Sequence, residues 1–178
     1  GVFMSTSDQS ATPLVLSVDA MGGDKGPAPI VAGLARFIAK NSGVQVLLHG
    51  PGIQLKPLIK KCKITNSVTI VDAPDVVSMS DKPSHVMRHG KSTSMWSAIE
   101  SVRAKDASVC VSCGNTGALM AVSMIRLRKA EGVNRPAIAC LWPSRNKAGF
   151  NVMLDAGADI RADEEDLLTY ALMGASYA

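Results

Sequence analysis

Short apolar runs alternate along the chain with longer segments in which apolar residues recur every three or four positions. The short runs predict strands, and the longer spacing predicts helices. We expect strands at residues 14–18, 44–48, 68–71, 108–111, 137–141 and 150–154. We expect helices at residues 27–40, 53–61, 84–88, 94–105 and 118–127, and from 163 toward the end. This alternation predicts an α/β fold, a three-layer α/β/α domain with a mostly parallel, Rossmann-like sheet.

Proline positions refine this pattern. Pro27 is suited to the first turn of the first predicted helix. Pro57 lies inside the second helical pattern, so that helix either starts at Pro57 or kinks there. Small-residue loops follow several predicted strands directly, and ligands of parallel sheets bind beyond the carboxyl ends of the strands. These loops are therefore the places where a functional site is expected.

The composition fits one globular domain over residues 14–178, because 47% of the 178 residues are hydrophobic and 19% are charged. Residues 1–13 are small and polar, and we expect a disordered tail or an expression scar there, with Met4 as a natural start. They lack the basic and apolar blocks of a signal peptide, which predicts a cytoplasmic protein with reduced cysteines. No apolar run approaches the roughly 18 residues that a membrane span needs.

The charge of the chain is mildly basic, with a formal net charge of +4. This charge favours anionic partners, but it is too small to indicate nucleic acid, and no basic run interleaved with aromatic residues is present. Cys110 and Cys113 form a C-x-x-C pattern without a second cysteine pair or a neighbouring histidine pair. Zinc or another metal is therefore not predicted.

The first glycine-containing loop follows the first predicted strand and holds Asp19, Gly22, Gly23 and Asp24. Adjacent glycines permit unusual backbone angles, and the carboxylates can accept N–H bonds within the loop. The loop lacks the G-x-G-x-x-G spacing of dinucleotide-binding proteins. It is either part of a binding site or a purely structural turn.

The second such loop, residues 112–117, joins a strand to a helix. Gly114 and Gly117 remove the Cβ atoms that would block close approach, while Asn115 and Thr116 add hydrogen-bonding side chains. A strand, a small-residue loop and a helix start direct backbone N–H groups and the helix dipole toward an anion. We expect this loop to bind an oxyanion; the alternative is an ordinary tight turn.

A third segment gathers the cations Lys82, Arg88 and Lys91 shortly before Ser94. One of residues 92–94 is expected to cap the helix that follows. Cations beside free helix-start amides favour a phosphate site. A solvated charged loop is the alternative.

Asp155 ends the last predicted strand, and a small-residue loop follows it. A carboxylate at this position can orient a neighbouring group or ligate a metal, although such a turn is more often structural. The acidic residues 163–166 are expected to stabilise the start of the last helix.

The chain has no G-x-S-x-G elbow, and none of its three histidines begins an H-x-x-x-x-D motif. Transfer chemistry here therefore lacks an obvious covalent nucleophile.

In their order along the chain, these segments resemble the bacterial acyl-acyl-carrier-protein:phosphate acyltransferases that begin phospholipid synthesis, the PlsX family. The resemblance runs from about residue 14 onward. The matching segments are DAMGGD at 19–24, KPS at 82–84, Arg88 with Lys91 and residues 94–95, GNTGALM at 114–120, RPAI at 135–138, Asp155 with residues 157–158, and Met173, Gly174 and Tyr177. The departures are Cys113 where alanine is usual, residues 89–90 where a more basic pair is usual, and Asp159 where asparagine is usual.

The resemblance implies an enzyme in which inorganic phosphate attacks the thioester of a fatty acyl-carrier protein and gives acyl phosphate, without a cofactor. A thiol leaving group with a pKa near ~8.5 needs little acid assistance, so the phosphate must be aimed and the charge on the carbonyl oxygen stabilised. The residues implied as catalytic are Asn115, Thr116 and Lys91. The residues implied in phosphate or substrate binding are Asp19, Gly22, Gly23, Asp24, Lys82, Arg88, Ser94, Gly114, Gly117 and Asp155.

The resemblance also implies a longer protein, because the family continues for roughly as many residues again. The second half is expected to supply a catalytic lysine, part of a homodimer interface and helices that contact the membrane. The implied partners are acyl carrier protein and inorganic phosphate, with no nucleic acid. The implied location is the cytoplasm, including the inner face of the membrane. The N-terminal half alone is expected to be inactive.

Two other functions remain open. A nucleotide-binding oxidoreductase on a similar sheet is disfavoured by the missing dinucleotide fingerprint. A non-catalytic binder of an acidic carrier protein would use a basic cluster that is otherwise a solvated helix face. That cluster is Lys56, Lys60, Lys61 and Lys63. Binding of phosphate without binding of NAD would separate the three functions.

Overall fold

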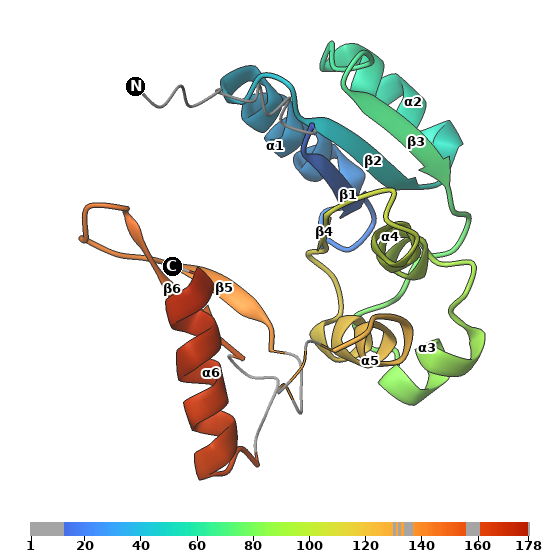
Figure 1. The fold of residues 1–178 in the computed structure, drawn as a ribbon. Helices are drawn as coiled ribbons and strands as arrows, with labels where there is room; N and C mark the ends of the chain where they lie inside the picture. The colour runs from blue at the N-terminus through green and yellow to red at the C-terminus, as the bar shows by residue number, and fades with distance from the viewer. Residues whose placement is uncertain (1–12, 130, 132, 134–136, 156–160, 178) are drawn as a thin grey trace, which may run out of the picture.

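The computed structural model describes residues 13–129, 131, 133, 137–155 and 161–177 (Figure 1). Strands and helices alternate along most of this chain. The strands are β1 (Val15–Asp19), β2 (Gln45–Gly50), β3 (Val68–Asp72), β4 (Val109–Val111), β5 (Ala139–Pro143) and β6 (Phe150–Leu154). The helices are α1 (Pro27–Lys40), α2 (Gly52–Lys61), α3 (Pro83–His89), α4 (Ser94–Arg103), α5 (Thr116–Arg126) and α6 (Glu164–Tyr177).

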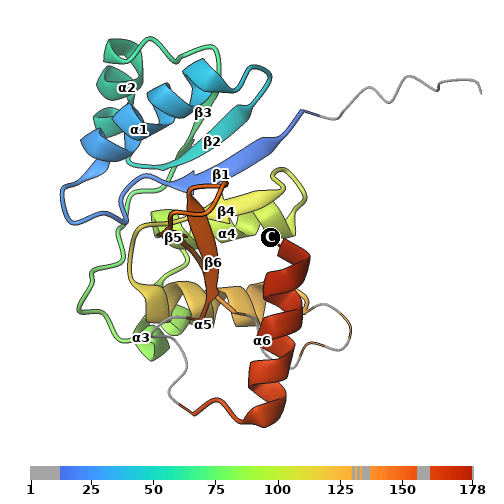
Figure 2. The ribbon, with the colours of Figure 1, turned by 90° about the vertical axis from the view of Figure 1, so that its left-hand side faces the viewer.

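The first four strands form a parallel sheet in the order β3-β2-β1-β4. The register sets Val18 of β1 beside Leu48 of β2 on one side and beside Val111 of β4 on the other. Figure 2 shows α1 and α2 on one face of this sheet and α4 on the other, with α3 and α5 beyond α4. The predicted α/β fold with helices on both faces of a parallel sheet is confirmed.

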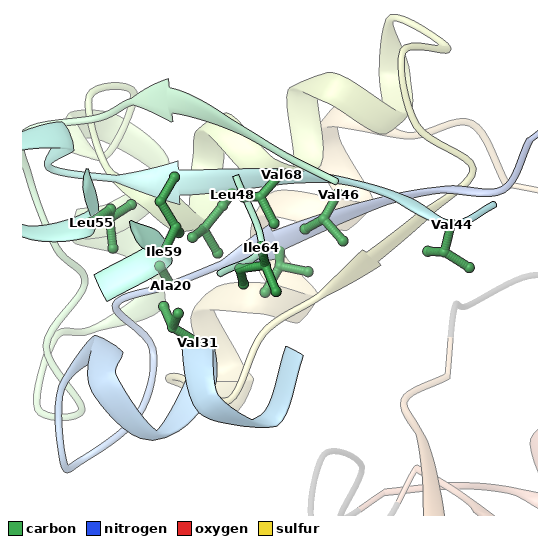
Figure 3. Packing of buried hydrophobic residues seen from close by; sticks show 10 residues of the cluster. Ala20, Val31, Val44, Val46, Leu48, Leu55, Ile59, Ile64 and Val68 are labelled. Atoms are coloured by element: carbon green, nitrogen blue, oxygen red, sulfur yellow. The ribbon is translucent and has the colours of Figure 1, made fainter. Parts of the chain in front are cut away.

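The face of the sheet toward α1 and α2 is apolar (Figure 3). Val46 and Leu48 of β2 pack with Val31 of α1 and Leu55 of α2, and none of the four is more than 1% exposed. Burial of one such side chain contributes about 1.5–3 kcal/mol to folding. This cluster holds α1 and α2 against the sheet. The first glycine-containing loop joins β1 to α1, so its position depends on this packing.

A second apolar cluster lies among α3, α4 and α5. Val86 of α3, Met95 and Ile99 of α4, and Val122 of α5 are each at most 2% exposed. These contacts hold α3 against α5, although α3 has only seven residues. Burial of Val86 therefore attaches α3, and the cations around it, to the rest of the domain.

The last two strands do not join the parallel sheet. β5 and β6 pair with each other in an antiparallel, two-stranded sheet, and α6 packs on β6. The strands expected at 137–141 and 150–154 therefore exist, but their placement in a mostly parallel sheet is wrong. The reason is the short segment 144–149 between them, because parallel neighbours need a crossover of about a dozen residues or more.

Several predicted boundaries shift by a few residues. The second helix begins at Gly52, so a start at Pro57 is wrong, and Pro57 lies inside the helix on its exposed side. The first turn of α6 carries the expected acidic residues 164–166. The described residues contain no helix that is both long and apolar enough to cross a bilayer. The expected tail at residues 1–13 lies outside the described residues except for Pro13, and so does Asp159.

Candidate functional site

The loops that follow β1 and β4 touch through two glycines. A Cβ atom built on Gly22 would lie 2.6 Å from the backbone nitrogen of Gly114, and one on Gly114 would lie 3.1 Å from the Cα of Gly22. Real Cβ atoms almost never approach other atoms as closely as the first of these distances. Gly22 is therefore required for the close approach of the two loops, and a side chain at Gly114 would require its neighbours to shift by a few tenths of an ångström.

Asp19, at the carboxyl end of β1, joins these loops to the start of α4. Its Oδ1 accepts hydrogen bonds from the Ser94 hydroxyl at 2.6 Å and from the Met21 N–H at 3.1 Å. Its Oδ2 accepts from the Ser112 hydroxyl at 2.8 Å. The Ser112 oxygen in turn accepts from the Gly114 N–H at 3.1 Å. The Asp19 cluster (Asp19, Ser94 and Ser112) therefore connects three segments that are far apart in sequence.

Asp19 is suited to organising the loops rather than to contacting an anion. Its side chain is 2% exposed, and both of its carboxylate oxygens already accept hydrogen bonds. A carboxylate also repels a second negative charge at short range. Its assignment to phosphate binding stays a prediction, and the geometry favours an indirect contribution through Ser94 and Ser112.

Asn115 is the N-cap of α5, with its Oδ1 accepting the Ala118 N–H at 3.0 Å. Its Nδ2 donates toward the carbonyl oxygens of Ser78 at 3.1 Å, Met79 at 3.3 Å and Asp81 at 2.9 Å. Asn115 therefore fixes the segment before α3 against the start of α5. The next residue, Thr116, begins the helix with an exposed side chain.

The predicted cations lie on exposed positions around α3. Lys82 is the residue before α3 and directly follows Asp81, whose carbonyl oxygen is bound by Asn115. The Arg88 Nε donates to the Ser84 carbonyl oxygen at 3.1 Å, one turn back along the helix. Lys91 lies in the turn before α4. Among the described residues, none of these three cations forms an ion pair, so their charges are available to a ligand.

The start of α4 confirms the expected cap. The Thr93 hydroxyl oxygen accepts the Trp96 N–H at 3.3 Å. The Ser94 N–H is bound by the Asp75 carbonyl oxygen at 2.9 Å. Lys91 therefore lies two residues before the N-cap of a helix whose start is held both at its backbone and at the Ser94 side chain.

The remaining residues of the first loop line an open groove of about 740 Å³ beside α1. Gly23 and Asp24 line this groove, together with Lys25 and Cys113. Its walls are mainly apolar side chains from β1, β4 and α1: Leu16, Val18, Ile30, Leu34, Phe37 and Val111.

Asp155 lies apart from the Asp19 cluster. Its backbone N–H donates to the Ile138 carbonyl oxygen at 2.6 Å, and its Oδ1 accepts from the Ile138 N–H at 3.3 Å. The sequence pattern placed Asp155 at the carboxyl edge of the parallel sheet, and this placement is wrong because β6 pairs with β5 in a separate antiparallel sheet. Asp155 closes the hairpin, and its role as a ligand stays a prediction. Its Oδ2 is buried and has no hydrogen-bond partner among the described residues.

The cysteines differ in environment. Burial, with a smaller contribution from the Asp19 charge, raises the pKa of the Cys110 thiol to about 12, so Cys110 is inert and faces the core as expected. Cys113 is exposed, and all four cysteines are free thiols. The described residues hold no cluster of histidines, cysteines or carboxylates suited to a metal. The importance of the Ser112 side chain is not visible in the sequence, because a serine in a loop carries no local signal of its bond to Asp19.

Comparison with known proteins shows the family of this chain. The model of a family described as "Fatty acid synthesis protein" matches residues 14–178. A phosphate acyltransferase of Cereibacter sphaeroides (strain ATCC 17025) is 68% identical over 166 residues, which are 93% of this chain and 45% of that protein. A phosphate acyltransferase of Paracoccus denitrificans (strain Pd 1222) is 60% identical over 184 residues, covering 98% of this chain and 50% of that protein.

The chain thus spans about half the length of the curated relatives that it matches. The family match covers every loop around the Asp19 cluster. The chain belongs to the fatty acid synthesis protein family of PlsX-type phosphate acyltransferases.

Proposed function

We propose that this chain is the phosphate-binding half of an enzyme that transfers a fatty acyl group from acyl-acyl carrier protein to inorganic phosphate. The observation that carries the proposal is the Asp19 cluster, which holds the start of α4 and the loop before α5 at one edge of the sheet. Two helix starts with exposed cations beside them form a favourable environment for an oxyanion. The relatives named above are phosphate acyltransferases, which supports this class of reaction.

The proposed reaction needs no covalent intermediate on the protein. A phosphate oxygen attacks the thioester carbonyl carbon, the carbonyl oxygen becomes negative, and the carrier thiolate then leaves with the electron pair of the C–S bond. Lys91, with Lys82 and Arg88, holds the phosphate. Thr116 and the amides of the loop before α5 stabilise the carbonyl oxygen. Asn115 contributes by keeping that loop against the segment before α3.

The partners of the whole protein belong to the same proposal. These are acyl carrier protein, inorganic phosphate, a second copy in a homodimer and the membrane surface, reached from the cytoplasm. Since the matched relatives are about twice as long as this chain, we propose that residues 1–178 alone are inactive. The rest of the protein would supply the remaining catalytic residues.

Titration of the purified chain with inorganic phosphate, followed by two-dimensional NMR, tests the proposal. Saturable shifts are expected at the amides of Gly114 and Thr116 and at Lys91, and NAD at the same concentration should leave these signals unchanged. A chain that binds NAD instead would support the oxidoreductase alternative. A chain that binds acyl carrier protein through Lys60 and its neighbours, and no phosphate, would support the carrier-binding alternative.

A further inference from the structure

The two faces of the parallel sheet differ in chemistry. Toward α1 and α2 the sheet presents valine and leucine side chains (Figure 3). Toward α4 it presents three buried polar side chains, Ser17, Asp19 and His49, each at most 2% exposed. Buried polar groups of this kind are costly unless they are hydrogen-bonded, so their partners indicate what they do.

The partners come from one face of α4. Ser94, Ser97 and Ser101 are spaced at three and four positions, which places them in a single row along the helix. Ser94 donates to Asp19 at 2.6 Å, and the Ser97 oxygen lies 2.8 Å from the His49 Nδ1. The Ser101 oxygen lies 3.4 Å from the His49 Nε2.

These bonds determine which nitrogen of His49 carries its proton. The Ser17 hydroxyl donates its only proton to the Ala98 carbonyl oxygen of α4 at 2.8 Å. The Ser17 oxygen must therefore accept from the His49 Nε2, which lies 2.9 Å away. Nε2 then carries the proton, and Nδ1 accepts from Ser97. Burial lowers the pKa of His49 to about 4, which agrees with a neutral ring.

An apolar helix–sheet contact tolerates sliding of the helix, whereas directional bonds to a buried ring favour one position along the helix axis. We propose that His49 is a positioning residue: through Ser17 and Ser97 it fixes α4 on the sheet and thereby holds Lys91 and Ser94 in place. Among the described residues, the His49 side chain bonds only to Ser17 and to α4, while its backbone carbonyl oxygen accepts the Ala20 N–H at 2.9 Å, a bond that substitution of the side chain leaves in place. Its effect reaches Asp19 through α4, and from Asp19 it reaches Ser112 and Gly114.

The test compares two buried substitutions on opposite sides of the sheet. His49→Leu removes the bonds to α4, whereas Ile59→Ala removes buried volume from the other face, where Ile59 is 7% exposed. We expect amide hydrogen exchange at Ser94 and Gly114 to become at least tenfold faster in His49→Leu than in Ile59→Ala. Equal exchange rates in two variants with similar melting temperatures would show that His49 only adds stability, and would overturn the proposal.

Two further measurements keep the test decisive. Long-range proton–nitrogen NMR of the unmodified chain should show the proton of His49 on Nε2, and a proton on Nδ1 would contradict the proposal. If His49→Leu does not fold, Ser97→Ala removes the shorter bond to the ring, with Ser101→Ala as its control at the longer distance. Ser97→Ala should speed exchange at Ser94 and Ser101→Ala should not; identical behaviour would count against the proposal.

A last measurement rests on the proposed function. The dissociation constant for inorganic phosphate should rise at least fivefold in His49→Leu and less than twofold in Ile59→Ala. An equal rise in both would count against positioning by His49. An unmodified chain that binds no phosphate would contradict the proposed function, whereas the exchange rates and the proton position would still decide the role of His49.

Discussion

The helices α4 and α6 have similar shares of apolar residues but very different surroundings. On α4, Met95 and Ile99 are at most 1% exposed, because the helix lies between the sheet and α5. On α6, Leu168 and Leu172 are 62% and 63% exposed, and the main packing partner of the helix among the described elements is β6. Figure 1 shows α6 with β5 and β6 apart from the parallel sheet.

This difference shows that apolar residues stabilise a fold only where a partner covers them. The parallel-sheet unit (β1–β4 with α1–α5) covers most of its own apolar side chains. The hairpin unit (β5, β6 and α6) exposes Leu141 and Trp142 by 57% and 59%, in addition to its leucines. Exposed apolar patches of this kind mark interaction surfaces. We therefore expect chemistry to depend on the first unit and association on the second.

The largest expected effect concerns the hairpin unit. Residues 1–178 alone should self-associate and form no acyl phosphate, and extension to the full length of the relatives should restore activity. Leu168→Glu combined with Leu172→Glu should reduce self-association in sedimentation velocity, because charges on α6 oppose burial of that surface. Ile53→Glu is the control, since Ile53 is 86% exposed on α2 of the other unit. A monomeric, fully active chain of 178 residues would contradict the division between the two units.

Acid should destabilise the parallel-sheet unit through His49. The pKa of His49 is about 4 in the folded chain and its ordinary value is 6.5, so protons bind the unfolded chain more readily. Stability should therefore fall between pH 6.5 and 4, by about 3 kcal/mol for this group alone. Denaturant unfolding of the unmodified chain and of His49→Gln, compared across this range, isolates the contribution. The same pH slope in both would contradict it.

Two glycine substitutions within the parallel-sheet unit test whether the contact between the loops after β1 and β4 stabilises the fold. Gly22→Ala should lower stability by about 2 kcal/mol, because its Cβ would lie 2.6 Å from the Gly114 nitrogen. Gly33→Ala is the matched control: no atom lies within 4 Å of its Cβ, and alanine favours the helix. Thermal unfolding should show a loss for the first and no loss for the second. An unchanged melting temperature in Gly22→Ala would show that the two loops tolerate separation.

The smallest predicted effect comes from removing single cations, and it compares cations near the Asp19 cluster with cations between β5 and β6. In the full-length enzyme, Arg88→Ala or Lys91→Ala should lower phosphate-dependent activity at least tenfold with little change in melting temperature. A contact with a charged group contributes about 1.5–3 kcal/mol, whereas exposed side chains contribute little to folding. Arg145→Ala and Lys147→Ala, exposed between β5 and β6, are the controls and should leave activity unchanged. Unchanged activity in all four would remove Arg88 and Lys91 from the site.

The sequence alone determined the alternation of strands and helices, the parallel pairing of the first four strands, and a helix cap at one of residues 92–94, which the structure places at Thr93. These features depend on hydrophobic periodicity and short-range hydrogen bonding, which a local pattern records. The loops at the carboxyl ends of β1 and β4 were predicted for the same reason, and the resemblance to the PlsX family is confirmed by the family match.

Only the tertiary structure decided how those loops are joined. Asp19 meets Ser94 across 75 positions and Ser112 across 93, and His49 meets Ser97 across 48. Hydrogen bonds between residues so far apart leave no periodic or spacing signal in a single sequence. The same limit explains the hairpin: β5 and β6 have strand-like sequences, but pairing partners are selected by chain geometry and by available edges.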